Sequence, residues 1–376
     1  MKIEVVASVS DVDAKRWDAL TDGSPLLSHA FLSALENTHC VGQGTGWQPY
    51  PLLVWNEDKL VGAMPLYIKS HSYGEYVFDW SWAEAYERNG IAYYPKLLSA
   101  IPFTPITGAR LLSADSTVQK LMAQTLLELV QRHQLSSAHV LFPDDVSAEA
   151  LQRAGWIERS GVQFRWENES FTDFEDFLKR LSHDKRKKIH QERKKISTAG
   201  VTSRQIQGAD ITEQDWDFFY QCYQNTYHEH RSTPYLTREF FSALTQNMSQ
   251  NVLLIIAEQG GEPIAAALNI VGDNALYGRY WGALRYVPGL HFELCYYQAQ
   301  EFCIANKIRY FEGGAQGEHK LARGFLSRAT RSYHHIAHPQ FAAAIKDFAG
   351  REALGIDNYN SELEERAPFK KGDRPL

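Results

Sequence analysis

Apolar runs broken by short polar turns recur in both halves of the chain. Residues 52–66 form an apolar run, a polar turn and a second apolar run, the pattern of a β-hairpin. Residues 253–268 repeat this layout, with Gly260 and Gly261 at the turn, where glycine favours tight hairpin geometry. The two halves therefore begin their sheets in the same way.

A helix and then a short strand follow each hairpin. Residues 116–133 place apolar side chains at helical spacing and precede an apolar run at 138–142. Residues 291–306 and 309–312 repeat this order in the second half. The shared order of helix, hairpin, strand, helix and strand predicts an internal duplication of an α+β unit, each with a mixed, mostly antiparallel sheet flanked by helices.

The first half is expected to end in a further hairpin. A short helix stops at Gly155, and strand-like residues then flank Ser160 and Gly161, a turn signal. We place the boundary at 168–172, which gives an N-terminal domain at 1–168 and a C-terminal domain at 169–350. Residues 353–376 are polar and lack periodicity, so we expect a loose tail there.

Length and composition fit this division. With 376 residues, 44% hydrophobic and 22% charged, the chain suits two ordinary globular domains. A net charge of -6 argues against a general nucleic-acid binder, so DNA is not expected and tRNA is not favoured. The start is too acidic for a signal peptide, and no apolar run could span a membrane. Four scattered cysteines without a CxxC pair indicate a reducing, cytoplasmic setting and no metal site.

The chemistry concentrates in a polar block at residues 291–325. Within it, charged side chains surround three glycines over a dozen or so residues. A hydrophobic core does not tolerate such charges, and a solvated helix face does not need those glycines. The block therefore predicts a loop that brings ionisable groups to one ligand, and a charged surface turn is the alternative.

Several blocks resemble a known family. The arrangement of strands and helices is similar to the GNAT acyltransferase fold, and two such units in one chain resemble the Fem (FemABX) peptidoglycan-bridge transferases. The basic helix at 185–201, which ends in Gly200-Val201, looks like the Fem R-x-x-I-x-x-x-x-K pattern. Residues 103–112, 290–298 and 312–324 are more closely similar to the bacterial FemAB-like predicted N-acyltransferases. The resemblance implies a tandem GNAT-like fold and transfer of an acyl or aminoacyl group to an amine.

Amine acylation requires a base to remove a proton and N–H donors to stabilise the oxyanion. No G-x-S-x-G or Cys-His protease pattern occurs, so direct attack fits best. We take Glu312 as the first candidate for the base, since it ends a strand before two glycines. His319 and Glu293 are the other catalytic candidates, although Glu293 could instead accept the amides of a helix start.

The remaining candidates would bind the substrate or the acyl donor. Strand arginines beside aromatic rings and cations in glycine-rich loops often hold carboxylates or phosphates, although such charges also occur simply at the surface. The basic helix could contact the phosphates of a nucleotide-linked substrate or of tRNA, or could be a solvated face. The residues are Arg279, Tyr280, Gly289, His291, Gln316, Lys320, Arg323 and Lys188.

The expected function is an N-acyltransferase in the metabolism of peptidoglycan precursors. The resemblance implies acyl-CoA or aminoacyl-tRNA as co-substrate, no tightly bound cofactor, and a small-molecule or peptide amine as acceptor. The loop at 285–291 has one glycine, which favours the alternative of a non-catalytic binding module for a cell-wall precursor or partner. A third hypothesis is a hydrolase that uses the same polar block.

Overall fold

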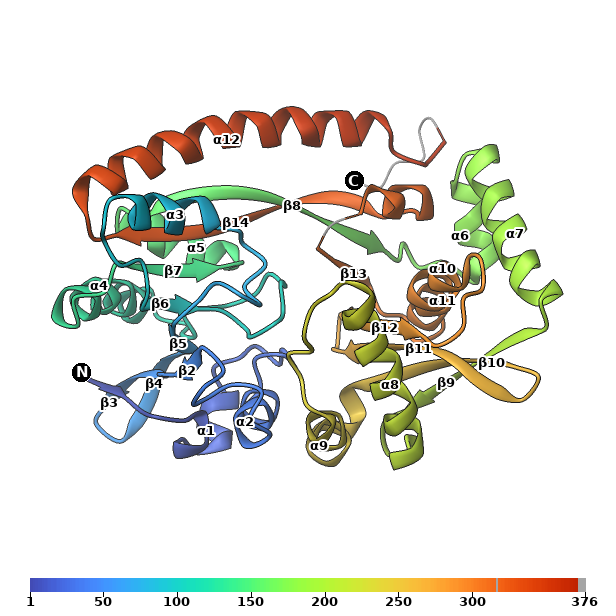
Figure 1. Cartoon of the computed structure of the whole chain (residues 1–376), viewed down its shortest axis with the longest axis horizontal. Helices are drawn as coiled ribbons and strands as arrows, with labels where there is room; N and C mark the ends of the chain where they lie inside the picture. The colour runs from blue at the N-terminus through green and yellow to red at the C-terminus, as the bar shows by residue number, and fades with distance from the viewer. Residues whose placement is uncertain (316, 371–376) are drawn as a thin grey trace. The chain divides into compact units, whose positions relative to one another are not determined.

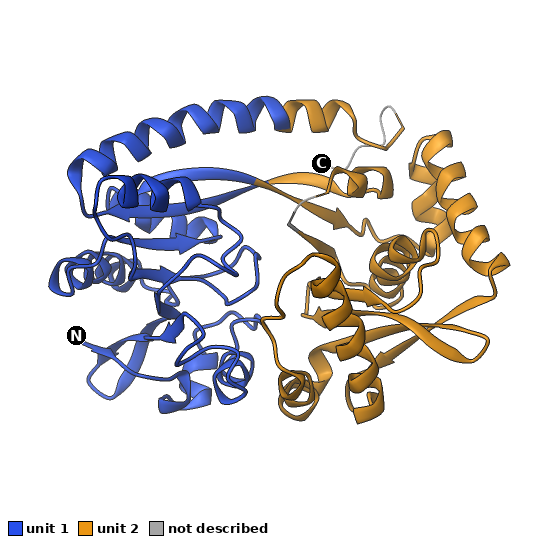
Figure 2. Ribbon diagram, in the orientation of Figure 1, with its two compact units in different colours: residues 1–161, 329–359 blue, residues 162–328, 360–376 orange. Residues whose placement is uncertain are grey.

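The computed structural model describes residues 1–315 and 317–370 and divides into two compact units (Figure 2). Unit 1 comprises residues 1–161 and 329–359, and unit 2 comprises residues 162–328 and 360–376. The chain therefore leaves unit 1, builds most of unit 2 and then returns. Both units combine helices with strands (Figure 1), as the sequence predicts.

Unit 1 holds two groups of strands. A small sheet has the order β1-β3-β4, and the larger group has the order β2-β5-β6-β7-β14-β8. The strands are β1 (Lys2–Val5), β2 (Trp47–Pro49), β3 (Leu52–Asn56), β4 (Lys59–Met64), β5 (Leu66–Lys69), β6 (Lys96–Ser99), β7 (Ser137–Leu141), β8 (Ile157–Glu167) and β14 (Leu326–Ile336). Strands β6 and β7 run parallel, whereas β7 and β14 run antiparallel.

The helices of unit 1 follow the predicted amphipathic pattern. Helix α4 buries Val118, Met122, Leu126 and Leu129 against the strands, and the side chain of Asp115 caps its start. The helices are α1 (Ala14–Asp18), α2 (His29–Asn37), α3 (Trp80–Arg88), α4 (Ser116–Arg132), α5 (Asp145–Arg153) and the first part of α12 (Pro339–Glu365).

Arg110, in the loop before α4, is a packing residue of unit 1. Its guanidinium is fully buried and donates to the carbonyl oxygens of Ile106 and Leu141 at 2.6 and 2.9 Å. These bonds fix the loop that leads into α4, because a buried guanidinium needs hydrogen-bond acceptors around it.

Unit 2 is built around the strand order β8-β13-β12-β11-β10-β9. Strands β12 and β13 run parallel and their neighbours run antiparallel. The strands are β9 (Val201–Gln207), β10 (Val252–Gln259), β11 (Glu262–Val271), β12 (Ala275–Ala283) and β13 (Tyr310–Ala315). The hairpin predicted at 253–268 is thus confirmed as β10 and β11.

Helices cover the strands of unit 2. Helix α8 packs so closely on β12 that a Cβ on Gly282 would lie 1.9 Å from the carbonyl oxygen of Cys222. The helices are α6 (Phe174–Arg180), α7 (His183–Thr198), α8 (Glu213–Glu229), α9 (Arg238–Met248), α10 (Leu290–Phe292), a π-helix (Glu293–Tyr297), α11 (Gln298–Ala305) and a 3₁₀-helix (Glu318–Arg323).

Two local predictions were wrong. The hairpin expected around Ser160 and Gly161 is instead the single strand β8, because Gly161 stays extended against the Thr330 side chain rather than turning. The tail expected from residue 353 is helical as far as Glu365, as part of α12. That helix buries few side chains, among them Ile345, Ala349 and Leu363, so its sequence carries little periodicity.

The unit division also differs from the domain ranges placed on the sequence. The first break lies after Gly161, not at 168, and residues 329–350 group with unit 1. The cause is β14, whose residues 332–336 pair with β7. Such long-range pairing leaves no local signal in the sequence.

Candidate functional site

The polar block lies where two parallel strands of unit 2 stop pairing. Their described register runs from Ala275 opposite Tyr310 to Tyr277 opposite Glu312. Strand β12 then continues to Ala283 and β13 to Ala315. Beyond Glu312 strand β13 no longer pairs with β12, although Ala315 still pairs with Gln163 of β8.

A π-helix begins directly at Glu293. The wider turn at Glu293–Tyr297 interrupts the helix between α10 and α11, and Gly289 precedes α10 with a φ of 90°. Single π turns inside α-helices often occur at functional sites, because they redirect side chains. Here the π-helix carries Tyr296 and Tyr297, which contact different parts of the polar block.

His319 is the exposed histidine of the block. Its Nε2 lies 2.9 Å from the hydroxyl of Tyr296, which fixes the ring. Partial burial of the ring, together with the charges of Lys320 and Arg323, lowers the pKa of His319 below its usual value. At neutral pH the imidazole is therefore largely uncharged and able to accept a proton.

His291 lies near His319. Its ring centroid is 5.5 Å from that of Tyr296 and 6.0 Å from that of His319. Burial, with His319, Arg323 and Lys320 nearby, lowers the pKa of His291 to about 4. His291 thus packs as a neutral ring against Tyr296 and does not compete with His319 for a proton near pH 7.

Lys320 is a buried cation in the same short helix. It is 3% exposed, and its Nζ donates to the carbonyl oxygen of Gly314 at 3.1 Å. Burial lowers the pKa of Lys320 to about 8. The ammonium therefore remains mostly charged at pH 7 and provides a positive charge beside the strand end at Glu312.

Arg323 acts as a clamp within the unit. Its Nη2 lies 3.0 Å from both carboxylate oxygens of Glu192, and its Nη1 donates to the carbonyl oxygen of His319 at 2.7 Å. The guanidinium carbon lies 3.5 Å from the ring centroid of Phe292, and the residue is 2% exposed. Tyr297 also donates to Glu192. These contacts tie α7 to the π-helix and to the short helix that carries His319.

A second ion pair of α7 holds Glu293. Arg193 donates to both oxygens of Glu293 at 3.0 and 3.2 Å and also pairs with Glu301 at 2.6 Å. Gln298 donates to Glu293 at 2.9 Å as well. The carboxylate of Glu293 is thus 5% exposed and bonded to side chains of α7 and α11, not to the amides of a helix start.

Glu312 ends the pairing of β13 and meets a cation. Arg165 of β8 donates to Glu312 Oε1 at 2.6 Å, and the Glu312 side chain is 15% exposed. Arg165 also lies over the ring of Tyr310, at 4.8 Å from the centroid. One oxygen of this carboxylate is therefore engaged in an ion pair next to the glycines.

The other described candidates contact different residues. Arg279 lies at a bulge in β12, since Tyr280 and Gly278 oppose consecutive residues of β11. Its guanidinium contacts Tyr280, whose ring in turn meets Tyr223 of α8. Lys188 is exposed on α7. Gln316 lies outside the residues that the structure describes.

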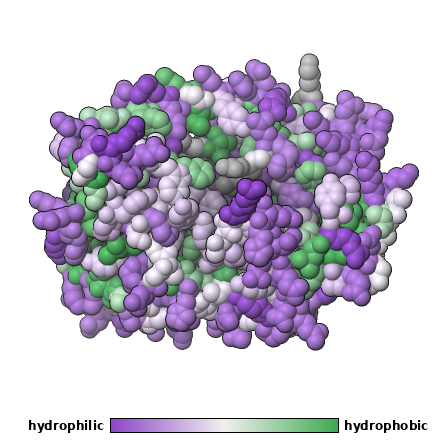
Figure 3. Space-filling model, viewed as in Figure 1, coloured by the Kyte–Doolittle hydropathy of each residue, from purple (hydrophilic) through white to green (hydrophobic). Residues whose placement is uncertain are grey.

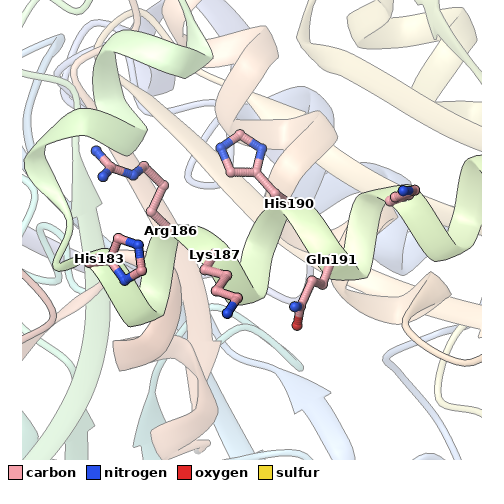
Figure 4. Close-up of a pocket in the computed structure, with 6 residues that line it drawn as sticks. His183, Arg186, Lys187, His190 and Gln191 are labelled. Carbon is pink, nitrogen blue, oxygen red and sulfur yellow. The ribbon is translucent and has the colours of Figure 1, made fainter.

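Two hollows border α7. The first, about 280 Å³, follows its cationic face and is lined by His183, Arg186, Lys187, His190, Gln191 and Lys194 (Figure 4). The second, about 540 Å³, lies between α7, β9 and the π-helix, and Arg193, Ser203, Glu293 and Gln298 are among its lining residues. A cationic groove along a helix suits a phosphate-bearing ligand.

Four residues that organise the site were not predicted from the sequence. They are Arg165, Glu192, Arg193 and Tyr296. Three of them come from β8 and α7, more than a hundred residues before their partners. The sequence around Tyr296 fits an ordinary helix and carries no signal for its role in the site. A glutamate within the otherwise basic 185–195 run was a signal for Glu192, since an isolated opposite charge often has a specific partner.

The described part of the chain lacks a cluster of metal ligands and a helix suited to span a membrane. Residues 1–315 and 317–370 contain no group of three or more histidine, cysteine, aspartate or glutamate side chains placed to hold a metal ion. The same residues include no helix that is long and apolar enough to cross a membrane.

A protein-family model described as peptidoglycan biosynthesis/recognition matches residues 8–371. No curated protein matches the chain significantly. Among solved structures the chain is similar to FemX, with a TM-score of 0.56, 10% identity, and coverage of 92% of this chain and 100% of that one. It is also similar to L-PGS from Bacillus licheniformis, with a TM-score of 0.55, 9% identity, and coverage of 90% and 97%. At these identities the likeness concerns the fold, and the predicted tandem GNAT-like architecture is confirmed.

Proposed function

This chain belongs to the FemAB-like family of peptidoglycan biosynthesis and recognition, and we propose that it transfers an acyl or aminoacyl group to an amine of a peptidoglycan precursor. The observation that supports this proposal most strongly is the exposed His319, held by Tyr296 and kept neutral by its surroundings. A neutral, oriented imidazole is the base that amine acylation needs.

In the proposed reaction the amine nitrogen attacks the carbonyl carbon of the donor. The nitrogen–carbon bond forms as the carbonyl becomes an oxyanion, and His319 takes the surplus proton from nitrogen. In the tautomer whose Nε2–H donates to the Tyr296 hydroxyl, Nδ1 is the nitrogen that accepts this proton. The oxyanion then collapses, the bond to the donor sulfur or oxygen breaks, and the proton passes to that leaving atom.

We assign the base to His319 in preference to Glu312 and Glu293. Both carboxylates form ion pairs, with Arg165 and Arg193 respectively, and the attacking amine would have to disrupt these pairs. In this proposal Glu312 orients the strand end and Glu293 anchors the π-helix. Lys320 supplies positive charge for the developing oxyanion.

The donor is either an acyl-CoA or an aminoacyl-tRNA. Both carry phosphates, and the cationic groove of α7 could accept them. Lys188, exposed on the same helix, is a further candidate contact. FemX and L-PGS resemble the chain in fold. This likeness does not distinguish between acyl-CoA and aminoacyl-tRNA as the donor.

The proposal can be tested by incubating the protein with a nucleotide-linked peptidoglycan precursor and each donor in turn, with mass spectrometry to detect the acylated amine. His319→Gln should reduce the rate by roughly 10²-fold or more. His228→Gln is a matched control, because that histidine is exposed and belongs to α8, which carries no residue of the polar block.

Two other outcomes would count against transfer. Donor consumption without an acylated acceptor would identify a hydrolase. Precursor binding by wild type and His319→Gln alike, with no product from any donor, would favour the non-catalytic binding module.

A further inference from the structure

The loop between β12 and α10 presents apolar side chains to solvent. Tyr286 is 87% exposed and Leu284 is 49% exposed, and Pro288 is exposed between Val287 and Gly289. Large apolar side chains that protrude together commonly mark an interaction surface, since each costs free energy while it contacts water. We call residues 284–288 the apolar tip.

The backbone of the apolar tip is fixed at both ends. The amide of Leu284 donates to the carbonyl oxygen of Ile264 at 2.8 Å, and the amide of Leu290 donates to that of Val287 at 3.1 Å. Arg285 donates to the Gln259 side chain at 3.0 Å, in the turn between β10 and β11. The outward apolar side chains are therefore held in place by the fold.

The basic helix α7 borders the apolar tip. A Cβ on Gly289 would lie 4.0 Å from Ile196 of α7, and Gln259 donates to the carbonyl oxygen of Ala199 at 2.8 Å. Figure 1 shows the segment that leads into α10 beside α7. Lys194 and Lys195, which directly precede Ile196, are both exposed. Two exposed lysines of α7 therefore lie one and two residues from the contact with Gly289, and the exposed Arg285 lies within the tip itself; Glu262 is an exposed acidic residue at the start of β11.

We propose that the apolar tip and the adjoining lysines dock unit 2 on an anionic lipid surface. Leucine, tyrosine and proline side chains enter the boundary between headgroups and acyl chains, while lysines pair with anionic headgroups. A nucleic acid would also attract the lysines, but it offers no apolar phase for Leu284 and Pro288. The docking is independent of the proposed transfer and can be measured without any substrate.

Docking would bring the polar block to the membrane. The apolar tip directly follows β12, which forms one side of the site, and directly precedes the helix that carries His291. An acceptor amine attached to a lipid could then reach His319 without leaving the bilayer surface.

Vesicle flotation tests the proposal on the full chain. We expect binding to vesicles of about 70% phosphatidylcholine and 30% phosphatidylglycerol, and little binding to phosphatidylcholine alone. Tyr286→Asp together with Leu284→Asp should weaken binding at least tenfold. Lys194→Gln with Lys195→Gln should weaken it on the order of 30-fold at low salt, since each lysine near the surface contributes about a fivefold factor.

A depth probe separates insertion from charge attraction alone. Tyr286→Cys, labelled with an environment-sensitive fluorophore, should show a blue shift and brighter emission on anionic vesicles. Leu354→Cys is the matched control, because Leu354 is 67% exposed on α12 in unit 1. Its emission should not change.

The proposal would be overturned by wild-type protein that does not float with anionic vesicles. It would also fail if the aspartate variant bound them as well as wild type does. A third result would also overturn it: the protein binds neither kind of vesicle but binds a tRNA through Lys194 and Lys195. These lysines would then be assigned to nucleic-acid binding. Failure of the transfer assay would leave these vesicle measurements unaffected.

Discussion

Two neighbouring candidates for the base, Glu312 and His319, differ in what surrounds them. Glu312 meets the guanidinium of Arg165 at 2.6 Å, so its charge is already compensated. The His319 ring is partly buried and has two cations nearby, which lower its pKa and keep it neutral, and its Nε2 meets the hydroxyl of Tyr296. At the scale of single residues, the electrostatic environment distinguishes the two roles.

The lowered pKa of His319 predicts a pH profile. A base must be unprotonated, so activity should fall as the pH drops through the pKa of His319 in the folded protein. Because that pKa is lowered, the midpoint of the fall should lie below pH 6.5. Lys320→Met removes one of the causes, so the midpoint should move to higher pH. We would measure the rate from pH 4.5 to 8 in both proteins, and a midpoint that moved to lower pH would contradict the assignment.

Gly317 gives a second residue-scale test. Its φ is 107°, and an added Cβ would lie 2.5 Å from Cε1 and 2.9 Å from Nδ1 of His319. Gly317→Ala should displace the imidazole from Tyr296 and lower activity by roughly 10²-fold, because reacting groups tolerate little misplacement.

The control for this test is Gly314→Ala. Gly314 also has a positive φ, 77°, but open space lies around its Cβ position. Both variants should lose about 1–2 kcal/mol of stability from backbone strain. Equal activity losses in the two variants would show that strain, and not the histidine ring, causes the effect.

At the scale of elements, α7 joins the parts of the site. Glu192 and Arg193, adjacent on this helix, bind Arg323 and Glu293, so one element positions both the π-helix and the short helix of His319. The opposite face of α7 carries the cationic groove (Figure 4). Most of the surface seen in Figure 3 is hydrophilic, so the basic helix does not stand out by polarity alone.

This arrangement predicts a large effect for Glu192→Gln. Arg323 is 2% exposed and would keep its buried charge without a carboxylate partner, which typically costs about 3–5 kcal/mol. The free energy of unfolding, measured in urea, should fall by that amount. Glu175→Gln is the control, because Glu175 is an exposed residue of α6 that meets only His190 at 3.6 Å among its described ion pairs, and it should change stability by less than about 0.5 kcal/mol. A similar small change in Glu192→Gln would mean that the clamp is unimportant.

The elements also show what the sequence could predict. Helix α4 and the hairpin of β10 and β11 were predicted because their apolar spacing is local and strong. The π-helix could not be predicted, since Leu294, Tyr296 and Tyr297 fit an ordinary helix equally well. Arg165 and Glu192 were missed because only tertiary structure brings them to Glu312 and Arg323.

Helix α12 extends through residues where a loose tail was expected, and this can be tested. Gly355 lies inside α12 with open space around its Cβ position. Gly355→Ala should raise the free energy of unfolding by about 0.5–1 kcal/mol, because alanine loses less entropy in a helix. Gly44→Ala, at an open loop position with a φ of 82°, should instead lower stability. Absence of any gain at Gly355 would indicate that this segment is not helical in solution.

At the scale of the whole molecule, the chain does not divide into two sequential domains. Unit 1 consists of residues 1–161 and 329–359, separated by most of unit 2. Strand β14 pairs with β7 from Ser332 opposite Leu141 to Ile336 opposite Ser137. Tyr333, Ile336 and Ile345 belong to the hydrophobic clusters of unit 1. The second half of the sequence therefore completes the first unit.

A fragment of residues 1–168, the domain expected from the sequence, should consequently fail to fold. Without β14, strand β7 would become an edge and its buried neighbours would be exposed to water. We expect no cooperative thermal transition by circular dichroism and rapid digestion by trypsin, whereas the full chain should unfold cooperatively. Joining residues 326–359 to this fragment through a long glycine-serine linker should restore a transition, because it returns the missing strand and part of α12. A fragment 1–168 that melted cooperatively by itself would instead show that the first half is a complete domain and that the pairing of β7 with β14 is dispensable.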